Sequence, residues 1–264
     1  MDVDERIASL DLSLFDAVPS QTYPEDRKSL LLIQRCVRRS GSYTYLEIGS
    51  HLGGTLQPHL LDSQCALIYS IDKRPSEQAD EAIGTYHYPE NSTQRMLNGL
   101  QEAFPQSPLH KIRTFDCDAR ELNQSEFSVK PDFCFIDGEH TDEAVFSDFQ
   151  SCLAVCKPDG IIGFHDANII AGGLSRIKQQ LAKSGTRFQG FVLPRHVYVI
   201  LLNRAIEMFA EEVKATSQDE SSYMRSVRWD LLKRRISRRY PGMQRIWHAC
   251  RRLVSGGNKQ IMYH

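Results

Sequence analysis

Acidic and histidine side chains end five apolar segments of this 264-residue sequence in turn. The residues at or just beyond these ends are Glu47, Asp72, Asp118, Asp137, and His165 with Asp166. A carboxylate or imidazole there can bind a cation, accept a hydrogen bond or take up a proton. Each acid alone could instead cap a helix or a turn. Their recurrence in five successive segments favours a shared site.

The first segment, YLEIGSHLGGTL at residues 45–56, places an acid beside a glycine-rich turn. Glycine lets the backbone approach a ligand closely. The spacing matches the dinucleotide pattern G-x-G-x-x-G only loosely. Glu47, two residues before Gly49, would repel a pyrophosphate but suits a cationic ligand. S-adenosylmethionine, with its sulfonium and ammonium groups, fits that polarity.

The next two acids along the chain have the spacing expected for contacts to the ribose and the adenine of an adenosine. Asp72 in YSIDKRP comes about 20 residues beyond the turn, where a carboxylate takes both ribose hydroxyls. Asp118 in FDCDARE is expected to reach the adenine amino group, and the Ala119 amide to lie near a ring nitrogen.

The last acids suggest the reaction chemistry. Asp137 and Asp166 could share a Mg²⁺ or another divalent cation, which would bind a vicinal diol and lower the pKa of one hydroxyl. His165, Asn168 or water alone would complete the ligands. In a metal-free alternative His140 is the general base, a role open to His165 as well. The structural alternative for His140 is to cap a helix starting near Thr141.

The elements that must position these residues follow from apolar spacing. Helices are expected at residues 25–39, 53–61, 92–104, 142–156 and 174–184. Strands are expected in SYTYLEIG, ALIYSID, HKIRTFDCDA, DFCFIDGEH and GIIGFHDAN, and two more within 188–202. This alternation predicts an α/β fold with a doubly wound, mostly parallel, Rossmann-like sheet, in which ligands bind outside the carboxyl ends of the strands.

Three regions lie outside that pattern. Residues 1–24 are expected to be irregular, and 25–203 to form the catalytic domain. Residues 75–91 read as a loop, either a lid that offers Tyr86, His87, Tyr88 and Asn91 to a substrate or a surface loop packing its own aromatics. Residues 204–264 are expected to form a basic helical extension.

Five segments in this order resemble the class I S-adenosylmethionine-dependent methyltransferases: YLEIGSHLGGTL, IYSIDKRP, FDCDARELN, CFIDGEHTDEAVFSDF and GIIGFHDAN. The resemblance covers roughly residues 25–202. More narrowly, the chain looks like a bacterial branch with an IDGxH strand end, which includes sugar O-methyltransferases and cephalosporin-hydroxylase-like proteins. The resemblance implies that the cofactor is contacted by a set of strand-end residues, namely Glu47, Gly49, Ser50, His51, Asp72, Asp118, Ala119 and Asp137.

Metal-dependent relatives, similar in this respect to catechol O-methyltransferase, use acids after the fourth and fifth strands as ligands. Asp137 and Asp166 match those places. Such relatives usually carry a second carboxylate or an amide next to the fifth-strand acid, whereas this chain has His165 and Ala167 there. His165 is therefore the expected third protein ligand, with Asn168 or water as the alternatives.

Composition narrows the class of protein. The chain is 41% hydrophobic and 25% charged, and no stretch reaches the ~18 apolar residues of a membrane span. The acidic start MDVDERIASLDLSLF does not read as a secretory signal. Seven cysteines without a CxxC pair suggest reduced thiols and a cytoplasmic location.

Charge is uneven along the chain. From Arg225 to Arg252 there are ten Lys or Arg and one acid, Asp230. Such a segment could lie on an anionic membrane surface, bind an acidic partner or a phosphorylated substrate, or pack as a helical hairpin on the catalytic domain or on a second copy in a homo-oligomer. The sequence contains no motif for sequence-specific nucleic-acid binding.

Together these patterns predict an S-adenosylmethionine-dependent O-methyltransferase. The expected acceptor is a hydroxyl on a sugar, a glycan or a related small molecule, with or without help from a divalent metal. The alternatives are a nicotinamide-dependent oxidoreductase on a similar sheet, or a non-catalytic member that binds a ligand or partner.

Overall fold

A seven-stranded sheet forms the centre of the protein. The structure, a computed structural model, describes residues 1–80 and 82–240. The strands of the sheet are β1 (Tyr43–Ile48), β2 (Cys65–Ile71), β5 (Ile112–Phe115), β6 (Phe133–Ile136), β7 (Ile161–Phe164), β8 (Phe188–Val192) and β9 (Tyr198–Leu202). Their order is β5-β2-β1-β6-β7-β9-β8, and only the pairings of β9 are antiparallel. The predicted doubly wound, mostly parallel sheet is confirmed.

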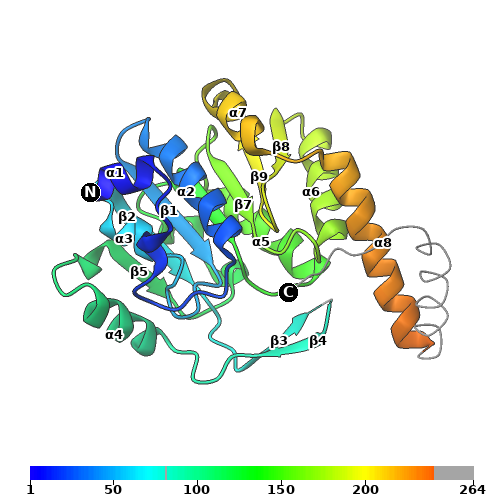
Figure 1. The fold of residues 1–264 in the computed structure, drawn as a ribbon, viewed down its shortest axis with the longest axis horizontal. Coiled ribbons are helices and arrows are strands. Elements are labelled where there is room, and N and C mark those ends of the chain that lie inside the picture. The colour runs from blue at the N-terminus through cyan, green and yellow to red at the C-terminus, as the bar shows by residue number, and fades with distance from the viewer. Residues whose placement is uncertain (81, 241–264) are drawn as a thin grey trace, which may run out of the picture.

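Helices cover both faces of the sheet (Figure 1). One face packs against α2 (Pro24–Arg38), α3 (Gln57–Leu61), α4 (Thr93–Ala103) and α7 (Arg204–Thr216). The other packs against α5 (Asp142–Val155) and α6 (Ala171–Lys183). Side chains alternate across β1, so Tyr43 and Tyr45 enter the first core and Leu46 and Ile48 the second. The central parallel strands β1, β6 and β7 therefore run between two apolar layers, and their carboxyl ends lie at one edge of the sheet.

Most predicted helices are found within three residues of their expected bounds. The exception is the helix expected at 53–61, which starts only at Gln57 because the glycine turn occupies the residues before it. Pro58 lies in its first turn, where a missing N–H costs nothing.

Residues 75–91 are not a loop, and that expectation was wrong. They contain an antiparallel hairpin of β3 (Glu77–Asp80) and β4 (Gly84–His87), which projects beyond the main sheet in Figure 1. The hairpin strands are largely exposed, so they lack the apolar alternation by which a strand is recognised in a sequence.

The N-terminal segment is also more regular than expected. It forms α1 (Val3–Ala8) and a 3₁₀ helix, η1 (Leu12–Phe15). Asp2 and Glu5 form a capping box at the start of α1. Three shorter 3₁₀ helices flank β5 and β6: η2 (Leu109–Lys111), η3 (Ala119–Glu121) and η4 (Gln124–Glu126).

Two helices follow the last strand. Phe209 and Val213 of α7 belong to the first core. The long helix α8 (Glu220–Arg239) buries Val227 but leaves about half of Trp229 exposed. In residues 1–80 and 82–240, no helix has the length and apolar character to cross a membrane. The rest of the predicted basic segment, residues 241–264, lies outside the described residues.

Candidate functional site

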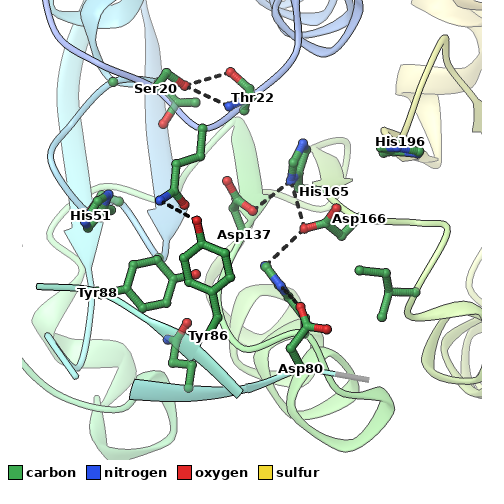
Figure 2. A pocket seen from close by; sticks show the side chains of 18 of the residues that line it. Ser20, Thr22, His51, Asp80, Tyr86, Tyr88, Asp137, His165, Asp166 and His196 are labelled. Carbon is green, nitrogen blue, oxygen red and sulfur yellow. Dashed lines mark hydrogen bonds and ion pairs between the residues drawn. The ribbon is translucent and has the colours of Figure 1, made fainter. Parts of the chain in front are cut away.

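A cavity of about 390 Å³ opens at the carboxyl ends of β1, β2, β6 and β7. Figure 2 shows its lining, which includes the predicted residues His51, Asp137, His165 and Asp166. Residues 19–23, ahead of α2, form one wall, and the β3–β4 hairpin forms another. The structure thus brings predicted strand-end residues into one cavity, as expected for a parallel sheet.

The glycine turn after β1 is fixed by a close backbone contact. Gly49 has φ +89°, and a Cβ there would lie 2.0 Å from the carbonyl oxygen of Asp137. Only glycine fits this position. The turn therefore packs directly against the end of β6, which places the glycine turn and Asp137 side by side.

Asp72 holds the other side of this turn. Its carboxylate is buried and accepts hydrogen bonds from the backbone N–H of His51 at 2.8 Å and of Arg74 at 2.7 Å. His51 and Arg74 both adopt positive φ. The Arg74 guanidinium also donates to the His51 carbonyl. Backbone strain supported by such contacts is typical of binding sites.

Glu47 lies beneath the turn rather than at the cavity surface. It is fully buried, and its two oxygens accept hydrogen bonds from the hydroxyls of Tyr45 and Thr55. Burial raises the pKa of Glu47 to about 7. Thr55 and Ser50 line the cavity. Glu47 therefore contacts the cavity only indirectly, by accepting the hydrogen bond of the Thr55 hydroxyl. The Ser50 hydroxyl is hydrogen-bonded to that of Ser70.

Asp118 is held by cations. Its carboxylate accepts from Arg120 at 2.9 and 2.7 Å and lies 2.9 Å from the Lys73 ammonium. The Arg120 hydrogen bond keeps the pKa of Asp118 well below its usual range. Ala119, the other predicted adenine contact, lines a narrow second cavity beside the turn.

His140 projects into the main cavity from the start of α5. Its Nδ1 lies 2.9 Å from Asp80 Oδ2, and its Nε2 lies 3.1 Å from Asp166 Oδ2. The helix cap is supplied by the Thr141 hydroxyl, so capping does not explain His140. Asp80 ends β3, and the sequence reasoning missed it because nothing in EQADEA marks it as a partner of a residue 60 positions away.

His165 is enclosed by carboxylates, as Figure 2 shows for Asp137 and Asp166. Its Nδ1 lies 3.0 Å from Asp137 Oδ1 and 3.2 Å from Asp166 Oδ2, and its Nε2 lies 3.4 Å from Asp26 of α2. Burial lowers the pKa of His165, but Asp137 and Asp166 outweigh this and hold the pKa well above its ordinary value. His165 is thus an internal cation that ties α2 to the strand ends.

The described residues contain one cluster that could hold a metal ion. Asp137, His140 and Asp166 each offer a ligand atom, and these atoms lie within 4.8 Å of one another. His165, the expected third ligand, instead turns both ring nitrogens towards carboxylates. The buried side-chain oxygen of Asn168, which lines the same cavity, has no hydrogen-bond partner in the described chain. These oxygen donors fit a hard divalent cation.

Aromatic side chains complete the outer wall. Tyr86 and Tyr88 of the hairpin region line the cavity with ring centroids 4.8 Å apart, and Tyr88 packs against His51. The Tyr86 hydroxyl accepts a hydrogen bond from Gln21 at 3.2 Å, which joins the two walls. Of the residues singled out in this region, Asn91 also lines the cavity, whereas His87 is exposed and pairs with Glu77.

Comparison with known proteins gives a family and a set of similar folds. Residues 46–167 match the family model Methyltransf_24, a methyltransferase domain. The O-methyltransferase NovP is 13% identical with a TM-score of 0.54, and 75% of this chain and 97% of that chain are covered. MycE, a methyltransferase from the mycinamycin biosynthetic pathway, was solved in complex with Mg, S-adenosylhomocysteine and mycinamycin VI. It is 14% identical to this chain with a TM-score of 0.49, and 75% of this chain and 54% of that chain are covered. No curated protein sequence matches.

The family match spans Glu47 to Asp166, and therefore all of the predicted strand-end residues. The likeness to NovP extends the same fold over three quarters of the chain. Residues 46–167 thus match a methyltransferase domain, and the fold of the chain is similar to that of an O-methyltransferase, in agreement with the resemblance inferred from its motifs.

Proposed function

We propose that this methyltransferase transfers a methyl group to a hydroxyl oxygen of a sugar, a glycan or a related small molecule. The observation that carries the proposal is the Asp80–His140 pair, whose imidazole reaches the cavity that Gly49 and Asp72 also line. In this proposal a base, a cofactor turn and an acceptor wall share one cavity.

His140 is suited to take the hydroxyl proton. Asp80 accepts the Nδ1 hydrogen, which orients the ring and leaves Nε2 facing the cavity as the basic nitrogen. An acceptor hydroxyl between Nε2 and Asp166 would replace the direct contact between those groups. The same pairing of a buried carboxylate with a histidine base activates hydroxyls in other enzymes.

The cofactor side of the cavity suits S-adenosylmethionine. Asp72 lines the cavity at the end of β2, where a carboxylate can bind ribose hydroxyls, and the Gly49 turn would let the backbone approach the amino-acid portion. The hydroxyls of Ser50 and Thr55 line the same region. When bound, S-adenosylmethionine supplies an electrophilic methyl group. The acceptor oxygen bonds to this methyl as the carbon–sulfur bond breaks, and the hydroxyl proton passes to His140.

We propose that a divalent cation assists the deprotonation of the acceptor hydroxyl. Asp137 and Asp166 would hold it, with the free Asn168 oxygen as a third donor, so that His140 keeps its Nε2 for the proton. Such an ion would lower the pKa of the bound hydroxyl. If His140 were a ligand instead, it could not also be the base.

Sugar recognition is supported by the aromatic wall. Tyr86 and Tyr88 line the cavity from the hairpin region, and Tyr23 lines it from the segment ahead of α2. Aromatic rings with a polar tip can pack against the apolar face of a sugar and bond to its hydroxyls.

Binding and turnover test the proposal separately. Calorimetry should show binding of S-adenosylhomocysteine at micromolar concentration, and labelled methyl groups should appear on members of a panel of glycosides and nucleotide sugars. His140→Ala should lower turnover by about 100-fold or more and leave the affinity for S-adenosylhomocysteine unchanged. The matched control is His87→Ala, an exposed histidine of the hairpin. Full turnover by His140→Ala would refute the proposed base.

A further inference from the structure

The long helix α8 carries two apolar stripes, and the first of them packs on the domain. Val227 is buried, and Tyr223 and Met224 pack against the second core, so this side of the helix faces the sheet and its helices. Figure 1 shows α8 along the outside of the molecule, next to α6. One apolar stripe is enough to dock a surface helix on its own domain. The second stripe therefore requires a separate explanation.

The second stripe lies on the outward side of α8. Trp229, Leu232 and Ile236 follow one another at spacings of three and four residues, which places them on one side of a helix. With about 3.6 residues per turn, this side is opposite the buried Val227. Trp229 is 51% exposed and Leu232 is 46% exposed, whereas Ile236 is partly buried. The helix thus presents large apolar side chains at the surface of the protein.

Cations border the outward stripe. The helix contains two acids and seven cationic residues, namely Arg225, Arg228, Lys233, Arg234, Arg235, Arg238 and Arg239. Both acids are paired with lysines, Glu220 at 2.5 Å and Asp230 at 2.9 Å. Arg225, Arg228 and Arg239 are exposed and flank the stripe at helical spacing. The outward side of α8 therefore combines an excess of positive charge with exposed apolar side chains.

One end of this surface contains a recess that suits a phosphate group. A groove of about 310 Å³ lies between α6 and α8 and is lined by Lys178, Arg225 and Arg228. The Arg228 guanidinium donates a hydrogen bond of 2.8 Å to the Ser175 hydroxyl, which holds it in the groove. Glu220 also lines the groove, but its carboxylate is paired with the Lys178 ammonium. Guanidinium groups bind phosphate oxygens well, so the groove favours a phosphate-bearing partner.

We propose that α8 binds the surface of a membrane that contains anionic lipids, through Trp229, Leu232, Ile236 and the arginines beside them. The apolar side chains need an apolar phase and the cations need anions within the same surface, and anionic lipids supply both. Helices with these two features lie in the interface, with their apolar side chains among the acyl chains and their cations at the headgroups. The helix is too highly charged to cross the membrane, so it would lie on the surface.

Binding of the full chain to lipid vesicles tests the inference. Vesicles of equal parts phosphatidylcholine and phosphatidylglycerol should sediment the protein at low salt, whereas pure phosphatidylcholine vesicles should not. The triple variant Arg225→Gln, Arg228→Gln, Arg239→Gln should bind the anionic vesicles about 100-fold more weakly, because each cation near the surface contributes about fivefold. The double variant Trp229→Ala, Leu232→Ala should bind about 10-fold more weakly or less, because less apolar surface enters the lipid.

A matched control shows whether the effect belongs to α8. The triple variant Lys28→Gln, Lys130→Gln, Lys183→Gln removes the same number of exposed cations from other parts of the chain. It should bind the anionic vesicles like the wild type. Circular dichroism checks that every variant is folded, and all of the substituted side chains are exposed, so no variant opens a cavity in the core.

Several results would overturn the inference. The wild type may fail to sediment with anionic vesicles, or the arginine variant may bind them as well as the lysine control does. Unchanged binding by the Trp229 and Leu232 variant would show that the apolar stripe stays out of the lipid. Tighter binding to duplex DNA than to vesicles, equal in wild type and that variant, would assign the arginines to nucleic acid.

A second copy of the chain is the remaining occupant to exclude. Sedimentation velocity without lipid would reveal a dimer, and its loss in the Trp229 and Leu232 variant would assign the stripe to that dimer and overturn the inference. A monomer that binds anionic vesicles supports it. These measurements use neither cofactor nor acceptor, so their outcome is independent of the proposed methyl transfer.

Discussion

Asp148, a buried acid of α5, makes the stability of the protein depend on pH. Burial raises its pKa from 3.8 to about 7. The folded state therefore holds a proton that the unfolded chain releases, so stability falls as the pH rises from about 4 to about 7 and is constant above that. At 1.36 kcal/mol per pKa unit, the full cost is about 4 kcal/mol, of which about 2.5 kcal/mol is incurred between pH 5 and pH 8.

Asp148→Asn isolates this effect. The amide does not ionise, so the difference in unfolding free energy between variant and wild type should rise by about 2.5 kcal/mol in favour of the variant from pH 5 to pH 8. The fixed cost of burying an amide is the same at both pH values and cancels. Glu47 has a raised pKa as well, but it is present in both proteins. Urea unfolding followed by circular dichroism, without cofactor, measures the difference.

The reasoning fails if the difference is the same at both pH values. Asp148 would then ionise normally in the folded protein, which would mean that water or a basic side chain reaches it.

Three further outcomes are expected. Asp80→Asn should lower turnover by about 10-fold to 100-fold at unchanged S-adenosylhomocysteine affinity, because it releases the His140 ring; equal turnover in steady-state assays would exclude a role for the pair. Gly49→Ala should destabilise the protein by more than ~2 kcal/mol in urea unfolding, whereas Gly99→Ala, a helical glycine with open space around it, should be neutral or stabilising. Chelation should abolish turnover and added Mg²⁺ restore it, with S-adenosylhomocysteine binding unchanged; full activity in the chelator would rule out the proposed ion.

The sheet and its strand ends could be predicted because buried parallel strands are continuous apolar runs. SYTYLEIG contains β1 with Glu47 near its end, and DFCFIDGEH contains β6 followed by Asp137. The β3–β4 hairpin could not be predicted, since its exposed strands carry no apolar alternation. Asp80 was lost with it, although it is the partner that orients His140.

Local sequence also could not show which side chains would neutralise one another. Asp118 fits an adenine contact by position, but Arg120 two residues later bonds to its carboxylate. Glu47 precedes the glycine turn as expected, yet Tyr45 and Thr55 occupy both of its oxygens. Asp148 reads as an ordinary helical acid, and only the packing of α5 shows that it is buried.

The ion pair between His165 and Asp26 means that the recognisable methyltransferase region is smaller than the working unit. The family match begins at residue 46, after the whole of α2. A protein trimmed to that start would keep the glycine turn and every strand-end acid, but it would lose the carboxylate behind His165 and the wall at residues 19–23. The imidazole would then be held from one side only, so the first 45 residues help to shape the cavity and to fix His165.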